Sequence, residues 1–272
     1  MAEQAPQTNT PPQPDDGKVS ETDAQKEKWT VEKALREIPL TPVTHSTSPI
    51  PFFHLLERLK TTKREGWRRF DIDHGESISD HMYRMSIMTM LAPSSLSSQL
   101  DVSRCISMAL VHDMAESLVG DITPMDNMAK TEKVRREADT MDFLCKSLLG
   151  RVDQGIAGDR IRQLWQEYED GETLEAKFVH DVDKMELILQ MIEYERTFEG
   201  RLDLGEFSGV AERIELEELK VWAEEVLRER GDYWKGIGKE SSGSVPIERE
   251  RHESQLNEYY GKGARNANGS AE

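Results

Sequence analysis

The chain has 272 residues and a formal net charge of −17, from 35 Lys and Arg against 52 Asp and Glu. Such a charge repels nucleic-acid phosphates and anionic membrane surfaces, so we expect neither as a partner. No run approaches the roughly twenty apolar residues of a membrane-spanning helix, and the first residues form no apolar signal region. We therefore expect a soluble protein of the cytoplasm, with the nucleus as the alternative location.

Composition divides the chain into a middle and two ends. The first fifty residues hold seven of the eleven prolines, and the chain beyond residue 235 is mostly Gly, Ser, Glu, Arg and Asn. Neither end can bury enough apolar surface to offset the entropy lost when its backbone is ordered. We therefore predict disordered tails at residues 1–48 and 236–272, and a single domain at residues 49–235, which is an ordinary domain size.

Apolar residues in the middle recur with the period of an α-helix, and capping residues, Gly or Pro bound each segment. No segment alternates for long enough to predict a strand, so the predicted fold class is all-α. Cys105 and Cys145 each fall within such a helical pattern, and we expect two buried free thiols. In chain order, the predicted helices cover about residues 52–65, 78–92, 102–119, 131–149, 161–168, 173–198 and 214–227.

Three ionisable residues stand at the end of the third predicted helix, which is otherwise apolar on nearly every side. His112 and Asp113 are followed one turn later by Glu116. Buried charges need partners, and these spacings let all three side chains address one patch. Imidazole together with carboxylate is a ligand set for a divalent transition metal. On this segment alone, however, a histidine paired with a carboxylate at a helix end is the commoner interpretation.

Context distinguishes the His112-Asp113 pair from a second one, His180-Asp181. The dipeptide by itself is weak, because a chain with this many His and Asp residues contains it by chance. Only the first pair closes a helix predicted to be buried. It is also followed by a glycine turn that can return Asp121 over the helix end.

A metal site at His112 and Asp113 needs further ligands from other helices. His81, in the first turn of the second predicted helix, is one candidate, although a core histidine is the alternative. Asp181 and Asp183 lie two apart on the long sixth helix and therefore on different faces. Spacing alone does not choose between these two carboxylates.

Three segments in this order resemble a known family: ESISDHMYRM around His81, ALVHDMAESLVGDITP around His112, and KFVHDVDKMELI around Asp183. They are similar to the HD-domain 5′-deoxynucleotidases, in particular the eukaryotic HD domain-containing protein 2 group, and the resemblance spans about residues 52–233. It implies an HD-domain helical bundle that holds a divalent cation: Mn, Co, another transition metal, or Mg. The implied ligands are His81, His112, Asp113 and Asp183, the second of the two aspartates on the sixth helix.

The resemblance also implies residues for the reaction. Glu116 matches the family's catalytic glutamate and Asp121 a second acidic residue of the site, and these two could instead hold a second cation. Arg64 and Trp67, in the segment KREGW, resemble the Arg and Trp that line the family's nucleotide pocket, with Arg68 as an alternative for the phosphate contact. On the residues alone, Arg64 is a surface charge and Trp67 an anchor that packs its loop onto the core.

The implied function is hydrolysis of deoxynucleoside 5′-monophosphates to a deoxynucleoside and phosphate by a homodimer. We expect little preference among bases, because no evident base-edge reader accompanies Arg64 and Trp67. We attribute discrimination against ribonucleotides to Trp67, whose indole could present a flat apolar wall to the sugar. The alternatives are another HD-type hydrolysis, of phosphodiesters or guanosine tetraphosphate, di-iron oxygenation, and a catalytically inert, metal-stabilised scaffold.

Overall fold

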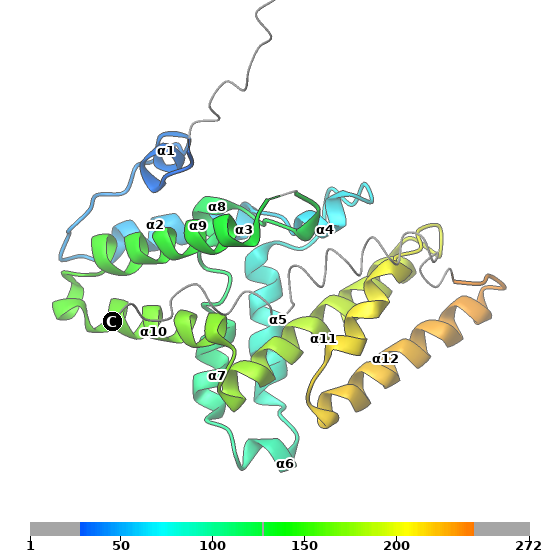
Figure 1. The fold of residues 1–272 in the computed structure, drawn as a ribbon. Helices are drawn as coiled ribbons and strands as arrows, with labels where there is room; N and C mark the ends of the chain where they lie inside the picture. The colour runs from blue at the N-terminus through cyan, green and yellow to red at the C-terminus, as the bar shows by residue number, and fades with distance from the viewer. Residues whose placement is uncertain (1–27, 127, 242–272) are drawn as a thin grey trace, which may run out of the picture.

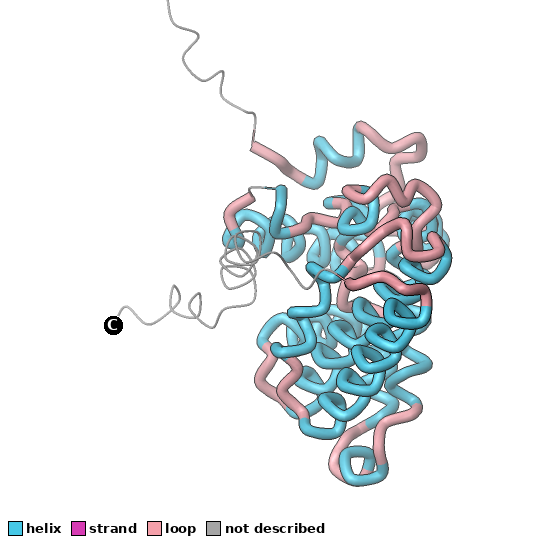
Figure 2. The backbone as a smooth tube through the Cα atoms, turned by 90° about the vertical axis from the view of Figure 1, so that its right-hand side faces the viewer, coloured by secondary structure: helices cyan, strands magenta, loops and turns pink. Residues whose placement is uncertain are grey.

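The computed structural model describes residues 28–126 and 128–241, and every regular element in these ranges is helical (Figure 2). The all-α prediction is therefore confirmed. The α-helices are α1 (Val31–Arg36), α2 (Ile50–Leu56), α3 (Arg58–Thr61), α4 (Glu65–Arg68), α5 (Ile78–Met90), α6 (Ser94–Ser97), α7 (Val102–Ala109), α8 (Glu116–Val119), α9 (Lys130–Asp142), α10 (Ile156–Asp170), α11 (Leu174–Thr197) and α12 (Glu217–Gly236). Tighter or wider helical turns are η1 (Pro124–Asp126), η2 (Phe143–Leu148), η3 (Val152–Gly155) and η4 (Gly205–Arg213).

Most predicted helices are present, with boundaries that differ in places. The long sixth helix, α11, begins where the sequence predicts, because the Thr173 side chain accepts a hydrogen bond from the backbone N of Ala176. The first predicted helix is divided into α2 and α3, and α10 and α12 extend beyond their predicted ends. These are the boundary differences expected when packing, rather than local signals, decides where a helix ends.

The third predicted helix is interrupted, which corrects the geometry assumed for its charged residues. Helix α7 ends at Ala109, residues 110–115 form successive turns, and α8 begins at Glu116. Within the turns some backbone bonds reach back three residues, as from the N of Met114 to the O of Val111, and others four, as from the N of His112 to the O of Met108. His112 and Asp113 therefore lie on turns and not on one continuous helical face.

A segment placed in the predicted N-terminal tail is folded, so that boundary was wrong. Helix α1 buries Val31, Ala34 and Leu35 and contacts α8 and α9. The Thr30 side chain caps this helix. The proline content of the first fifty residues conceals this short amphipathic stretch. Residues 1–27 and 242–272, which hold most of the two predicted tails, lie outside the described residues.

We expect Leu35→Ala to lower the free energy of unfolding by about 2 kcal/mol, because it removes buried methyl groups from the packing of α1. Leu35 is 9% exposed, whereas Leu40 is 61% exposed. The same change at Leu40 should cost less than about 0.5 kcal/mol and serves as the matched control. Urea denaturation of both variants gives the two values. Equally small effects would mean that α1 does not contribute to the core.

The apolar core consists of two clusters that meet at α5. One cluster packs α5 against α7, α11 and α12, and the other joins α1, α2, α3, α8, α9, η2 and α10. Helix α5 contributes Met85 to the first cluster and Ile78 and Met82 to the second. Figure 1 shows α5 passing from the layer of α2, α3, α8 and α9 toward α7 and α11. The first turn of α5, with His81, therefore lies where the two clusters join.

Both cysteines are buried and free, as the sequence predicts. Burial raises the pKa of Cys105 and of Cys145 to about 12, so neither thiol is a reactive thiolate. Within residues 28–126 and 128–241, no helix combines the length and the apolar composition that a membrane crossing requires.

Candidate active site

A capping box at the start of α5 fixes the position of His81. The Ser77 hydroxyl accepts a hydrogen bond from the backbone N of Asp80, and the Asp80 carboxylate accepts one from the backbone N of Ser77. This reciprocal pair satisfies two backbone donors that the first helical turn leaves without partners. His81 follows directly and points inward, with its side chain fully buried.

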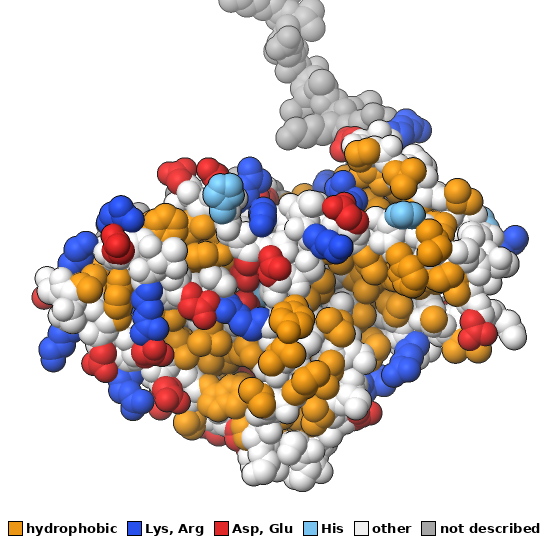
Figure 3. Space-filling view, turned by 180° about the vertical axis from the view of Figure 1, so that it is seen from behind, with side chains coloured by type: hydrophobic (Ala, Val, Ile, Leu, Met, Phe, Trp, Pro, Cys, Tyr) orange, Lys and Arg blue, Asp and Glu red, His pale blue; other side chains and the backbone are white. Residues whose placement is uncertain are grey.

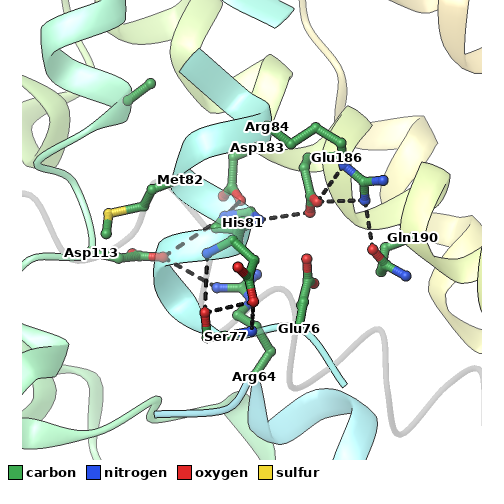
Figure 4. A network of polar contacts seen from close by, with 12 residues as sticks. Arg64, Glu76, Ser77, His81, Met82, Arg84, Asp113, Asp183, Glu186 and Gln190 are labelled. Atoms are coloured by element: carbon green, nitrogen blue, oxygen red, sulfur yellow. Dashed lines mark hydrogen bonds and ion pairs between the residues drawn. The ribbon is translucent and has the colours of Figure 1, made fainter. Parts of the chain in front are cut away.

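The structure brings three of the predicted metal ligands together and places the fourth, Asp183, against His81. Ligand atoms of His81, His112 and Asp113 lie within 4.8 Å of one another. His112 Nε2 is 3.2 Å from Asp113 Oδ2, and His81 Nε2 is 3.1 Å from Asp183 Oδ1. Figure 4 shows Asp113 and Asp183 converging on His81 from separate elements. One centre thus draws on α5, the turns between α7 and α8, and α11.

The two ring nitrogens of each histidine have different surroundings. His81 Nδ1 lies 2.6 Å from Glu186 Oε2, and His112 Nδ1 lies 3.0 Å from the backbone O of Ala109. Both Nε2 atoms are buried and have no hydrogen-bond partner in the described part of the chain. An imidazole that donates from Nδ1 presents the lone pair of Nε2. Two imidazole lone pairs facing carboxylate oxygens need a proton or a cation between them.

The carboxylates of the centre are held in their ionised form. Burial by itself would raise the pKa of Asp113. His112 and Arg64 have the larger effect, and they hold this pKa well below its usual range. Asp183 behaves in the same way, because its contact with His81 Nε2 and the charge of His81 outweigh its burial and lower its pKa. Two ionised carboxylates beside two imidazoles are a suitable set for a divalent transition metal.

His81 is protonated when no cation is bound. Burial and the charge of Arg64 lower the pKa of His81, but Glu186 and Asp183 raise it to about 10 overall. A metal cation bound at Nε2 takes the place of the proton on that nitrogen. The residues present therefore fit a divalent cation in charge, in donor type and in the direction of their lone pairs.

The structure separates Asp181 from Asp183, which spacing alone could not do. The Asp181 carboxylate is buried on another face of α11 and accepts hydrogen bonds from the backbone N of Glu215 and Leu216, at 2.9 and 2.7 Å. It also pairs with Lys184 at 2.9 Å. Asp181 thus holds the entry to α12, while Asp183 faces His81.

The histidine of the second His-Asp pair, His180, also has a structural role. His180 Nε2 lies 2.8 Å from the backbone O of Tyr168, and the two rings stack with centroids 3.9 Å apart. Tyr168 also contacts the metal centre. Its hydroxyl lies 3.3 Å from Asp183 Oδ2, and its ring centroid lies 4.8 Å from that of His112. Tyr168 was not predicted as a residue of the site, because its position on α10 gives no local signal.

Glu116 lies beside this centre in an environment that favours its protonated form. Its side chain is buried, and Oε2 has no hydrogen-bond partner in the described part of the chain. Burial, followed by the charges of Asp113 and Asp121, raises the pKa of Glu116 well above its usual range. Gly120, at φ +75°, makes the left-handed turn that carries the chain to Asp121. Asp121 Oδ2 accepts a hydrogen bond of 2.6 Å from the backbone N of Glu65.

Arg64, rather than Arg68, reaches the centre. Arg64 Nη1 lies 3.2 Å from Asp113 Oδ2, and its side chain is 17% exposed. The Arg68 side chain is 55% exposed and pairs with Glu65. The bond between Asp121 and the backbone of Glu65 fixes the segment that carries Arg64.

The position of Trp67 differs from the one expected for a residue that contacts the sugar. The residue is 1% exposed and belongs to the first apolar cluster. Its Nε1 donates a hydrogen bond of 2.8 Å to Glu76, and its ring packs on Tyr194 and Phe207 at centroid distances of 5.2 and 4.7 Å. The short helix α4 turns the indole inward, so the alternative interpretation, an anchor for its loop, describes its contacts.

Glu186 and Arg84 are two further residues of the site that the sequence did not lead us to predict. Glu186 is fully buried and contacts His81, and Arg84 donates to Glu186 (Figure 4). Each lies three residues after a predicted ligand, Glu186 after Asp183 and Arg84 after His81, and therefore shares its helical face. A charged residue at that spacing in an apolar stripe was the signal that could have found them.

The model of the HD domain matches residues 56–222 of this chain, well over half its length. The chain belongs to the HD-domain family. The chain is 45% identical over 192 residues to the 5′-deoxynucleotidase hdd1 of Schizosaccharomyces pombe, covering 71% of this chain and 95% of the relative. Identity to the human 5′-deoxynucleotidase HDDC2 is 43% over 148 residues, which cover 54% of this chain and 69% of the relative.

A solved structure of the HD domain-containing protein YGK1 is similar in fold, with a TM-score of 0.57 and 32% sequence identity. The match covers 76% of this chain and all of that one. The predicted HD-domain helical bundle is thus confirmed by sequence and by structure.

Proposed function

We propose that this HD domain is a metal-dependent 5′-deoxynucleotidase, which hydrolyses deoxynucleoside 5′-monophosphates to a deoxynucleoside and phosphate. The observation that carries the proposal is the cluster formed by the buried imidazoles of His81 and His112 with Asp113, which Asp183 joins through His81 and Arg64 through Asp113. The relatives of 40–45% identity named 5′-deoxynucleotidases support the substrate class.

His81, His112, Asp113 and Asp183 are the proposed ligands of the cation, which is Mn, Co, another transition metal or Mg. When bound, the cation supplies a Lewis acid for a phosphoryl oxygen and lowers the pKa of a bound water. Two imidazoles and two carboxylates leave coordination positions for both. The chain's own task is to hold these four side chains rigidly, which burial between the two apolar clusters accomplishes.

Arg64 and Glu116 are the proposed partners of the substrate. The guanidinium of Arg64 remains charged beside Asp113 and Asp121 and can neutralise the phosphate oxygens that face away from the cation. Glu116, with its raised pKa, keeps a proton that it can deliver to the leaving 5′-oxygen. Asp121 sustains that raised pKa and fixes the Arg64 segment. A second cation at Glu116 and Asp121 is the competing role for this pair.

We expect phosphate release from dAMP to exceed that from AMP by roughly 10- to 100-fold in kcat/KM, the effect of burying an extra hydroxyl without a partner. The bases of deoxynucleoside 5′-monophosphates should matter little, and 3′-monophosphates should be poor substrates. Steady-state phosphate release over this substrate panel measures all three. Comparable kcat/KM values for dAMP and AMP would leave a general phosphomonoesterase in place of a deoxynucleotidase.

Assembly and location are further parts of the proposal. Tyr83, Ile87, Met90 and Leu91 form an exposed apolar stripe along α5. Hydrophobic side chains also gather over the middle of the face shown in Figure 3. A stripe of this kind suits the self-complementary interface of a homodimer, which a mass measurement on the purified chain tests.

The two buried free thiols fit the reducing cytoplasm.

A further inference from the structure

Both ring nitrogens of His81 meet carboxylates from the same helix. Asp183 Oδ1 lies 3.1 Å from Nε2, and Glu186 Oε2 lies 2.6 Å from Nδ1. Because the two acidic residues are three apart on α11, they share one face and hold the imidazole between them (Figure 4). Only Nε2 points toward Asp113, at 3.8 Å, so only Nε2 belongs to the metal centre.

Arg84 determines how the Glu186 carboxylate is oriented. It lies on α5 one turn after His81 and donates from Nε and Nη2 to Glu186 Oε1, at 2.9 and 2.6 Å. The guanidinium is itself fixed by Gln190 and Glu193, at 2.8 and 2.6 Å. Glu186 is fully buried, and each of its oxygens has a defined partner, Arg84 on one and His81 on the other.

We propose that Glu186, oriented by Arg84, is a positioning residue that keeps a proton on Nδ1 of His81 and directs the Nε2 lone pair to the cation. This inference rests on the proposed metal-dependent function. A carboxylate that accepts from the outer nitrogen of a metal-binding histidine fixes the ring and makes the inner nitrogen a better ligand. The arrangement assigns separate tasks to the two acidic residues of α11: Asp183 binds the cation, and Glu186 orients the other ligand.

A cation bound between Glu186 and Glu76 is the rival explanation, because their carboxylates and His81 also cluster within 4.8 Å. Both Glu186 oxygens, however, already accept hydrogen bonds. Glu76 accepts one from Trp67 Nε1 at 2.8 Å. The hydrogen bonds therefore assign Glu186 to the imidazole.

The variant Glu186→Gln tests this orientation because the two ends of the glutamine amide differ: the oxygen accepts hydrogen bonds and the NH2 group donates them. The two N–H donors of Arg84 attract the amide oxygen, so the amide NH2 group faces His81 Nδ1. Two donors cannot face each other, and the proton of the imidazole is then favoured on Nε2, where it blocks the cation. Replacing Arg84 with Met in the same variant frees the amide to turn, so that its oxygen can again accept from Nδ1.

Two properties are measured on four proteins. These are the wild type, Glu186→Gln, the double variant that combines Glu186→Gln with Arg84→Met, and Glu193→Gln. The affinity for Co²⁺ is obtained by competition with a chelator. The presence or absence of a proton on Nδ1 of His81 is determined in metal-free protein by ¹⁵N NMR of the imidazole, assigned through His81→Asn. Glu193→Gln is the matched control, since Glu193 contacts Arg84 but is 48% exposed and does not contact His81.

We expect Glu186→Gln to weaken Co²⁺ binding roughly 10- to 100-fold, the usual effect of losing such an outer partner, and to remove the proton from Nδ1. The double variant should recover most of the affinity, and Glu193→Gln should behave as wild type. Wild-type affinity in Glu186→Gln, with Nδ1 still protonated, would overturn the inference. If Glu186→Gln fails to fold, the wild-type spectrum decides, because absence of a proton on Nδ1 contradicts the inference. A wild type that binds no Co²⁺ would instead refute the proposed metal centre, while the NMR result still tests Glu186.

Discussion

Asp183→Asn is expected to remove most of the bound divalent cation. Asp183 Oδ1 lies 3.1 Å from His81 Nε2, and its carboxylate is ionised because His81 and His112 lower its pKa. Asparagine supplies a neutral oxygen of similar size, so the charge is lost with little change in packing. The affinity should fall by more than the roughly 10- to 100-fold typical of an outer partner. Metal content after gel filtration, measured by plasma mass spectrometry, gives the answer.

Asp181→Asn is the matched control, two residues away on the same helix. Its carboxylate accepts hydrogen bonds from the backbone N of Glu215 and Leu216 and does not face the centre. We expect the cation to stay bound, while the free energy of unfolding falls by about 1–3 kcal/mol from imperfect bonding at the start of α12. Loss of the cation in Asp181→Asn and its retention in Asp183→Asn would move the ligand to Asp181.

Glu116→Ala is expected to lower kcat by at least roughly 100-fold, the scale of a positioned acid or base, while the cation stays bound. Burial and the charges of Asp113 and Asp121 favour the protonated carboxyl, which is the form that can protonate a leaving oxygen. Turnover of dAMP and metal content are measured on the same preparation.

Glu116→Gln separates the proton from the shape of the side chain. Because ionised Glu116 is disfavoured in the fold, the neutral amide should not lower Tm, yet it cannot transfer a proton and should lose as much turnover as alanine. If cation and activity are lost in equal measure in either variant, Glu116 is a ligand, as the second-cation interpretation requires.

Local patterns were sufficient to predict most of the helices and to make His81 and His112 candidates for the centre. The 3.6-residue period identified α5, α7 and α11, and His81 and His112 stood out as ionisable residues in apolar surroundings. The choice of Asp183 over Asp181 came from the family resemblance, because residues two apart on a helix differ only in what packs against each face. That packing is a tertiary property.

The remaining differences have tertiary causes as well. The turns at residues 110–115 interrupt a segment whose apolar pattern reads as continuous helix. Helix α1 is too short to be stable alone and forms because α8 and α9 cover it. The residues alone indicate that Trp67 is an anchor in the core, and only the resemblance implies a sugar contact. Tyr194 and Phe207, which come from distant segments and pack on its ring, could not be predicted from local patterns.

The most direct test of metal-dependent nucleotide hydrolysis is phosphate release from dAMP by one protein sample, before chelation, after chelation and after addition of Mn²⁺ or Co²⁺. We expect turnover to disappear with the cation and to return on its addition in wild type. In Asp183→Asn it should stay absent under the same conditions. Turnover that survives complete removal of the cation, or a fully metal-loaded protein that releases no phosphate from any deoxynucleoside 5′-monophosphate, would contradict the proposed function.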